Sequence, residues 1–187
     1  GDSMQIGYFD GTLSNIGIDS GIVMCSGDIN ELMPGFVNVL FPNSNADDPD
    51  LLDVANSVPD LIGQNFNVNS INDVCVLEFD FVPSSETVSF RYVFGSQEYF
   101  AWENSSFNDV FGFFISGPGI VGPYSSPPEF PDGSINIATV PNSDPPLPIT
   151  VSSVNSVTPI NEEFFVDNQE MTTVAVADGF TTVLTAE

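Results

Sequence analysis

The sequence predicts an all-β fold: an antiparallel β-sandwich of the jelly-roll kind, with one short surface helix and long loops rich in proline and glycine. Two observations support this. Short apolar or alternating runs recur along the 187 residues and are separated by Gly, Pro, Asn, Asp and Ser, the pattern of antiparallel strands joined by turns. Apolar residues make up 42% of the chain, enough for a sizeable core, and the length suits one domain over residues 1–187.

Seven runs are expected to form the strands. They are GIVMCSG (21–27), VCVLEFDFVP (74–83), TVSFRYVFGS (87–96), DVFGFFISG (109–117), INIATVP (135–141), ITVSSVN (149–155) and GFTTVLTA (179–186). Residues 117–148 are rich in proline and glycine outside their one short strand. This long stretch is expected at an end of the sandwich, where it either binds a partner or packs as a closed loop on its own aromatic residues.

The one helix is expected at DDPDLLDVAN. Asp48 can cap its N-terminus, and Pro49 suits the first helical position. Asp50 and Asp53 favour the positive end of the helix dipole. The helix is therefore a short crossover on the surface.

One hairpin can be placed in register. LEFDF and SFRYVF flank the turn VPSSET, and a turn centred on its two serines puts the leucine and both phenylalanines of LEFDF on one face. The same register sets Glu78 opposite Arg91. Arg91 is the only cation in the chain, so we expect it to form a cross-strand ion pair with Glu78 in preference to binding a ligand.

The charge of the chain limits its partners. With 26 acidic residues against one arginine, and no lysine or histidine, the net charge is -25. Phosphate recognition depends on Lys and Arg, so nucleic acid and anionic membrane surfaces are not expected as partners, and the sequence contains no membrane-spanning run. Divalent cations and a saline exterior suit such a chain, because both reduce its self-repulsion.

The missing residue types also limit the chemistry. Without His or Lys there can be no Ser-His, Cys-His or Ser-Lys dyad, no Schiff base and no imidazole zinc site. The two cysteines, Cys25 and Cys75, are expected either to form a disulfide in an exported protein or to remain as two buried thiols. Carboxylate catalysis and the binding of oxygen-ligated metal ions are therefore the kinds of chemistry still open to this chain.

A polar connection between two strands, QEYFAWENSSFN, is the candidate site. Ca²⁺ takes six to eight oxygen ligands, and the candidate ligands here are Glu98, Asn104, Asn108 and Asp109. The spacing differs from that of an EF-hand loop. The alternative is structural: the amides and carboxylates cap turns while the aromatic residues pack the end of the sandwich. A carboxylate pair in this segment could also serve a glycosidase, as acid and as nucleophile or base.

Five segments, in order along nearly the whole chain, are similar to a known family. They are GYFDGTLSNIGIDSGIVMCSGDI (7–29), LEFDFVPSSETVSFRYVFGSQEYF (77–100), FNDVFGFFISGPG (107–119), NIATVP (136–141) and DGFTTVLTA (178–186). In these motifs the chain resembles the choice-of-anchor L domain family. The resemblance implies a module of large exported bacterial proteins, carried beside varied C-terminal anchoring or sorting signals. It implies no established activity.

The chain departs from the family pattern in two respects. Family members often have Glu-Glu-Tyr followed shortly by another acid, whereas this chain has QEYFA at residues 97–101, so two carboxylates are missing while Glu98 and Asp109 stand at matching positions. The family pattern also has strands before GYFDG and after DGFTTVLTA. A sandwich without them exposes its sheet edges, so we expect the strands to belong to a longer polypeptide or to come from a neighbouring copy.

Taken together, the sequence predicts a secreted or cell-surface module that acts in adhesion or extracellular assembly, binding protein or glycan without catalysis. One alternative is a filament subunit, a homo-polymer completed by strand exchange between copies. The other is a carboxylate-dependent glycan-active enzyme. A cleft with two carboxylates about 5–10 Å apart would favour the enzyme. A carboxylate cluster closed over Ca²⁺, or an extended strand interface, would favour the module.

Overall fold

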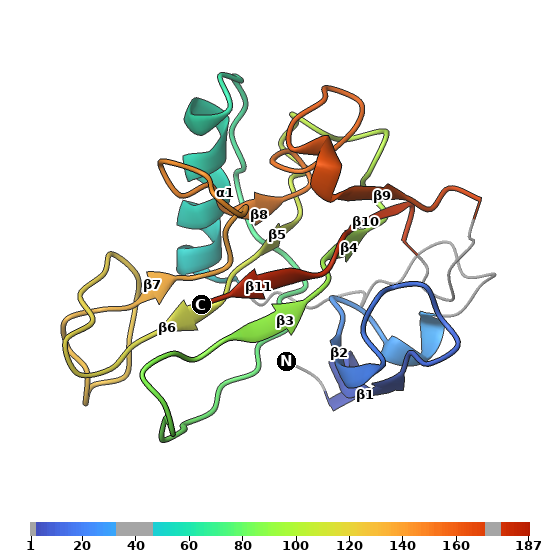
Figure 1. Cartoon of the computed structure of the whole chain (residues 1–187). Coiled ribbons are helices and arrows are strands. Elements are labelled where there is room, and N and C mark those ends of the chain that lie inside the picture. The colour runs from blue at the N-terminus through green and yellow to red at the C-terminus, as the bar shows by residue number, and fades with distance from the viewer. Residues whose placement is uncertain (1–2, 33–46, 171–176) are drawn as a thin grey trace.

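The computed structural model describes residues 3–32, 47–170 and 177–187 (Figure 1) and confirms the all-β prediction. The elements, in chain order, are η1 (Ser3–Gln5), β1 (Ile6–Asp10), β2 (Ser20–Met24), η2 (Ile29–Glu31), α1 (Pro49–Leu61), β3 (Phe90–Tyr92), β4 (Gly95–Ser96), β5 (Val110–Phe111), β6 (Phe114–Ile115), β7 (Ile135–Asn136), β8 (Ile149–Thr150), η3 (Glu162–Phe164), β9 (Phe165–Asp167), β10 (Gly179–Thr181) and β11 (Leu184–Ala186).

The strands of the described residues are divided among five small antiparallel sheets. Three pairs join strands that follow one another in the described chain, namely β1-β2, β6-β7 and β9-β10, while β4-β10, β11-β3 and β5-β8 join more distant strands. Figure 1 shows β11 lying beside β3 at the centre of the molecule, with the β1-β2 hairpin at its periphery. The last two described strands, β10 and β11, therefore pair with strands β4 and β3 from the middle of the chain.

Helix α1 begins as its sequence predicts. The carboxylate of Asp48 accepts a hydrogen bond from the Leu51 N–H at 2.9 Å, and Pro49 occupies the first turn. The helix continues to Leu61, beyond the predicted segment, and includes Pro59. Val58 and Pro59 are both buried, and this burial offsets the hydrogen bond that a proline cannot donate.

The core lies between α1 and strands from the second half of the chain. Its members are less than a tenth exposed: Val58, Val140, Leu147, Ile149, Val154 and Leu184. Helix α1 contributes Val58, β8 contributes Ile149 and β11 contributes Leu184. The core therefore joins parts of the chain that are more than a hundred residues apart.

The structure differs from the prediction around the segment 77–81. No strand is described there; β3 pairs with β11 instead, with Phe90 opposite Ala186. Two strands that the sequence analysis did not single out, β1 and β9, are present. The alternating pattern of 77–81 marks it as strand-forming but does not specify the segment that pairs with β3.

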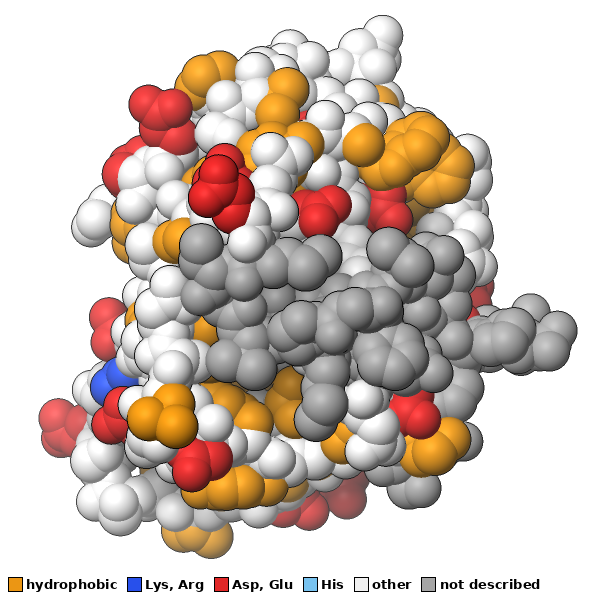
Figure 2. Space-filling model, turned by 90° about the vertical axis from the view of Figure 1, so that its right-hand side faces the viewer, with side chains coloured by type: hydrophobic (Ala, Val, Ile, Leu, Met, Phe, Trp, Pro, Cys, Tyr) orange, Lys and Arg blue, Asp and Glu red, His pale blue; other side chains and the backbone are white. Residues whose placement is uncertain are grey.

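Acidic side chains are dispersed over the face of the molecule shown in Figure 2. On the face shown in Figure 2 they lie between exposed hydrophobic and uncharged side chains and do not gather into one block. Within the described ranges, none of the helices is long and apolar enough to cross a membrane.

Candidate functional site

The polar connection of residues 97–109 leaves β4 and enters β5, as predicted. At its start, the N–H of Trp102 bonds to the carbonyl of Glu98 at 3.1 Å, forming a turn. Tyr99 is 1% exposed, and its ring centroid lies 4.8 Å from that of Phe165. Trp102 packs on Phe107 in a T-shaped contact with ring centroids 4.8 Å apart, and both rings remain exposed. Aromatic packing therefore fixes this connection at both ends.

Two of the predicted calcium ligands, Glu98 and Asp109, lie close together. The Ser96 hydroxyl donates to the Asp109 carboxylate at 2.6 Å and accepts from the Glu98 N–H at 2.9 Å. Asp178, immediately before β10, is near enough for its charge to act on Glu98. Asp178 lies about 80 residues away in sequence, and its only sequence signal is its position at the head of the DGFTTVLTA motif.

The pKa values of these three carboxylates are all raised above their ordinary values. Partial burial, and then the charges of Asp109 and Asp178, raise the pKa of Glu98. Desolvation of its carboxyl group raises the pKa of Asp109, although the residue as a whole keeps solvent-exposed surface. The hydrogen bond from Ser96 lowers this pKa, but by less than desolvation raises it. Burial and the charge of Asp167 raise the pKa of Asp178. The cluster therefore disfavours its own full ionisation.

The two predicted amide ligands make structural contacts, Asn108 through its side-chain oxygen and Asn104 through its backbone. The Asn108 side-chain oxygen accepts from the Ser152 N–H at 3.1 Å, and Asn108 is 4% exposed. The Asn104 N–H donates to the Ser152 hydroxyl at 2.9 Å, and Asn104 has a left-handed backbone with φ of 56°. Both asparagines thus tie the connection to the segment after β8.

The fit of calcium to the predicted ligands is partial. Glu98 and Asp109 lie near each other, and the Asn104 side-chain oxygen is buried without a hydrogen-bond partner in the described structure. The Asn108 oxygen, in contrast, is already used. In the part of the chain that the structure describes, no group of three acidic or cysteine side chains is arranged to hold a metal ion. Calcium at this place stays a prediction.

Arg91 does not form the predicted ion pair. Its guanidinium donates to the Gly17 carbonyl at 3.0 Å, and no ion pair joins it to Glu78 among the described residues. The reason is the change of partner strand: β3 pairs with β11, which places Thr185 opposite Arg91. The arginine therefore connects the loop between β1 and β2 to the central sheet.

Cys25 and Cys75 are both free thiols, and the structure brings them together across 50 residues of sequence. The carbonyl of Gln5 accepts from the Cys25 N–H at 2.9 Å and from the Cys75 thiol at 3.5 Å. Both side chains are partly buried. The sequence left a disulfide and a pair of thiols open, and the structure shows the thiols.

The segment 76–82 is extended and apolar, and much of it is exposed. The exposed fractions are 52% for Val76, 39% for Leu77, 49% for Phe79, 43% for Phe81 and 94% for Val82. The Phe79 and Phe81 rings pack on each other and on Phe90 with centroids 6.0–6.3 Å apart. No backbone–backbone hydrogen bond and no strand pairing join residues 76–89 to another described residue.

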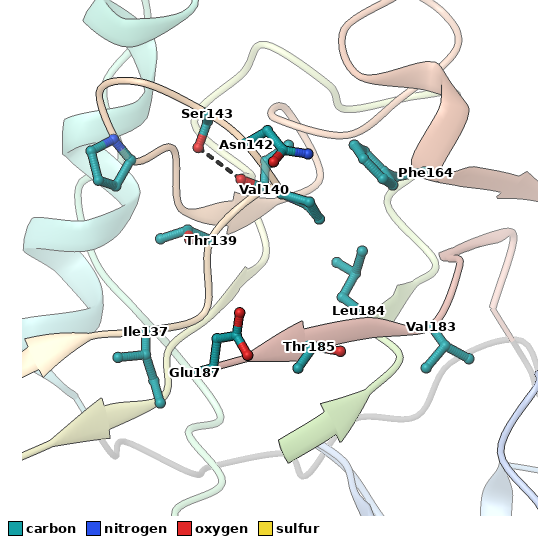
Figure 3. A pocket seen from close by; sticks show the side chains of 12 residues that line it. Ile137, Thr139, Val140, Asn142, Ser143, Phe164, Val183, Leu184, Thr185 and Glu187 are labelled. Carbon is teal, nitrogen blue, oxygen red and sulfur yellow. Dashed lines mark hydrogen bonds between the residues drawn. The ribbon is translucent and has the colours of Figure 1, made fainter. Parts of the chain in front are cut away.

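An open pocket of about 380 Å³ lies beside β11 (Figure 3). Its walls combine apolar side chains, among them Phe164 and Leu184, with polar ones such as Asn142 and Thr185. Glu187 is the one carboxylate among its lining residues. Glycoside hydrolysis by an acid and a nucleophile or base needs two carboxylates, and this lining supplies one.

Comparison with known proteins gives one match. The family model described as "Choice-of-anchor L domain" matches residues 1–187. Neither the curated proteins nor the solved structures contain a match to this chain. Because the family model spans the whole sequence, the chain belongs to the choice-of-anchor L domain family.

Proposed function

We propose that this protein is a non-catalytic module of an exported bacterial surface protein, and that it binds an extended segment of a partner protein along residues 76–82. Choice-of-anchor domains occur in exported bacterial surface proteins, which supports an extracellular location. The observation that carries the proposal is that residues 76–82 are exposed and strand-like, and that no strand pairing joins them to another described residue.

The first support is the apolar surface of this segment. Single exposed hydrophobic residues are ordinary on protein surfaces, but here five fall within seven consecutive positions. The Phe79 and Phe81 rings pack on each other at a tilt and on Phe90 in T-shaped contacts, and each side chain keeps nearly half of its surface exposed. A covering partner would bury this area and gain the corresponding hydrophobic free energy.

The second support is the backbone. Val and Phe favour strands, and the segment is extended, yet no ladder hydrogen bonds are described for it. A strand edge with free N–H and C=O groups pairs readily with an added strand. Strand addition of this kind supplies affinity through main-chain hydrogen bonds and specificity through alternate side chains.

The third support is charge, which selects the partner. Glu78 and Asp80 alternate with the aromatic residues of this segment, and the whole chain has a net charge of -25. A second copy would bring acidic residues to the same edge and has only Arg91 to offer as a cation. Charge complementarity therefore favours a partner strand in which apolar residues alternate with Lys or Arg over self-pairing into a filament.

The proposal is tested with two synthetic peptides of about eight residues, one alternating valine with lysine and one alternating valine with glutamate. We expect the lysine peptide to bind at least about tenfold more tightly and to lose affinity as salt is added. The measurement is fluorescence polarisation of the labelled peptides, with sedimentation of the protein alone as a check on self-association.

A matched pair of variants locates the binding edge. Phe79→Ala should weaken binding of the lysine peptide by about tenfold, because Phe79 lies on the proposed edge. Phe107→Ala should leave it unchanged, since Phe107 is 58% exposed and also packs on an aromatic neighbour but lies in the other connection. Equal loss in both variants, or equal affinity for the two peptides, refutes the proposal. Self-association without peptide would support the filament instead.

A further inference from the structure

Cys25 and Cys75 lie at a junction between two parts of the molecule. Cys25 directly follows β2, so it belongs to the peripheral β1-β2 hairpin (Figure 1). Cys75 directly precedes the exposed segment 76–82. In the described residues, β1 and β2 form strand pairs only with each other. A covalent bond at this junction would fasten the hairpin to the rest of the fold.

The two cysteines donate hydrogen bonds to the same backbone carbonyl. The Gln5 carbonyl accepts from the Cys25 N–H and from the Cys75 thiol, at 2.9 and 3.5 Å. The backbone of Cys25 is near enough to lower the pKa of the Cys75 thiol, against the larger effect of burial. The charge of Cys75 adds to burial in raising the pKa of the Cys25 thiol, so the two side chains are close enough to interact. Each thiol thus sits within the immediate surroundings of the other.

The raised pKa values of the two thiols argue against a role of the pair in redox sensing or metal binding. Desolvation by burial is the largest effect on both groups and raises the pKa of each thiol. Redox sensors and metal-binding thiolates have lowered pKa values and basic neighbours, and this chain has one arginine and no lysine or histidine. Partly buried thiols with raised pKa values, on two cysteines that share one backbone acceptor, are instead suited to a structural bond.

We propose that Cys25 and Cys75 form a structural disulfide when the chain meets a disulfide-bearing oxidant in an oxidising compartment. One cysteine thiolate attacks the oxidant's disulfide to give a mixed disulfide and releases one oxidant thiol. The second cysteine thiolate then attacks the mixed disulfide and releases the other oxidant thiol. The pair loses two electrons and two protons, and the oxidant is reduced to a dithiol. The product is a covalent clasp between the hairpin and Cys75.

The experiment measures free thiols in the full chain before and after treatment with oxidised glutathione or a disulfide oxidoreductase. The protein is denatured in N-ethylmaleimide and weighed by mass spectrometry. We expect two maleimide adducts before oxidation and none afterwards, with the loss of two hydrogen atoms. Digestion with a protease specific for Asp and Glu should then yield a peptide pair joined through Cys25 and Cys75, since acidic residues are frequent between them.

Thermal melting tests whether the bond is a clasp. Oxidised protein should melt at a higher temperature than reduced protein, and the Cys25→Ser/Cys75→Ser variant should show no difference between the two conditions. The single variants Cys25→Ser and Cys75→Ser provide the reference for bonds between molecules, because the one remaining thiol can form a disulfide only with a second chain or with the oxidant. Two maleimide adducts after oxidation, a wild-type dimer on a non-reducing gel, or equal melting of oxidised and reduced protein would each overturn the proposal.

Discussion

Leu184 offers the sharpest test of the core, because it brings the end of the chain into contact with helix α1. The residue is 2% exposed, and its cluster includes Val58 of α1 and Ile149 of β8. Leu→Ala at buried sites costs about 2.7–5 kcal/mol, depending on how far the cavity collapses. Leu184 also borders the open pocket of Figure 3, so water can reach part of the vacated space. We therefore expect the lower part of this range, about 3 kcal/mol.

The assay is urea and thermal unfolding followed by circular dichroism. For a domain of this length, about 3 kcal/mol corresponds to a melting temperature lower by roughly 6–12 °C. The matched control is Leu13→Ala, since Leu13 is 97% exposed and its truncation should change the free energy of unfolding by less than about 0.5 kcal/mol. Equal unfolding midpoints for the two variants would refute the placement of Leu184 in the core.

Two predictions concern the cluster of Glu98, Asp109 and Asp178. Each of the three carboxyl groups has a pKa that is higher in the folded state than in the unfolded state, so the folded state binds protons more tightly. The free energy of unfolding should therefore rise as the pH falls from 7 through the folded-state pKa values. It should level off once the pH is below the unfolded-state pKa values. Asp109→Asn should raise the melting temperature at pH 7 but not near pH 4. The exposed control Asp19→Asn should leave the melting temperature unchanged at both pH values. A wild-type melting temperature that falls as the pH is lowered from 7 to 4 contradicts the argument. If calcium binds here, millimolar Ca²⁺ should raise the wild-type melting temperature, chelator should reverse the rise, and Asp109→Asn should abolish it. An unchanged wild-type melting curve with calcium and with chelator would rule calcium out.

Local features of the fold were readable from the sequence. Asp48 and Pro49 mark the start of α1, because capping and proline geometry depend on adjacent residues alone. The end of α1 was not readable: Pro59 resembles a stop signal, but tertiary burial keeps it within the helix. Pairing between distant strands was also hidden. The pattern of Phe90 and Tyr92 indicates a strand, but nothing near them in sequence identifies β11 as the partner.

The same distinction applies to the candidate site. The connection between β4 and β5 and its polar residues could be predicted, and Glu98 and Asp109 do lie near each other. Asp178 could not be assigned to them, since it reaches the cluster only through pairing of β10 with β4. Asn108 has the right chemistry for a calcium ligand, yet its oxygen is used by the Ser152 backbone. Residue type indicates what an oxygen can bind, and only the fold shows what it does bind.

The pairing of β3 with β11 has a consequence for the order of folding. The hydrogen-bond ladder of β3 pairs Phe90 with Ala186 and Tyr92 with Leu184. It can form only after these partners, more than 90 residues later in the chain, have been synthesised. Contacts between such distant segments slow folding, because a long loop must close before any of its free energy is recovered. During synthesis, the centre of this protein therefore remains open, with its strands exposed to other chains, until residues 184–186 arrive.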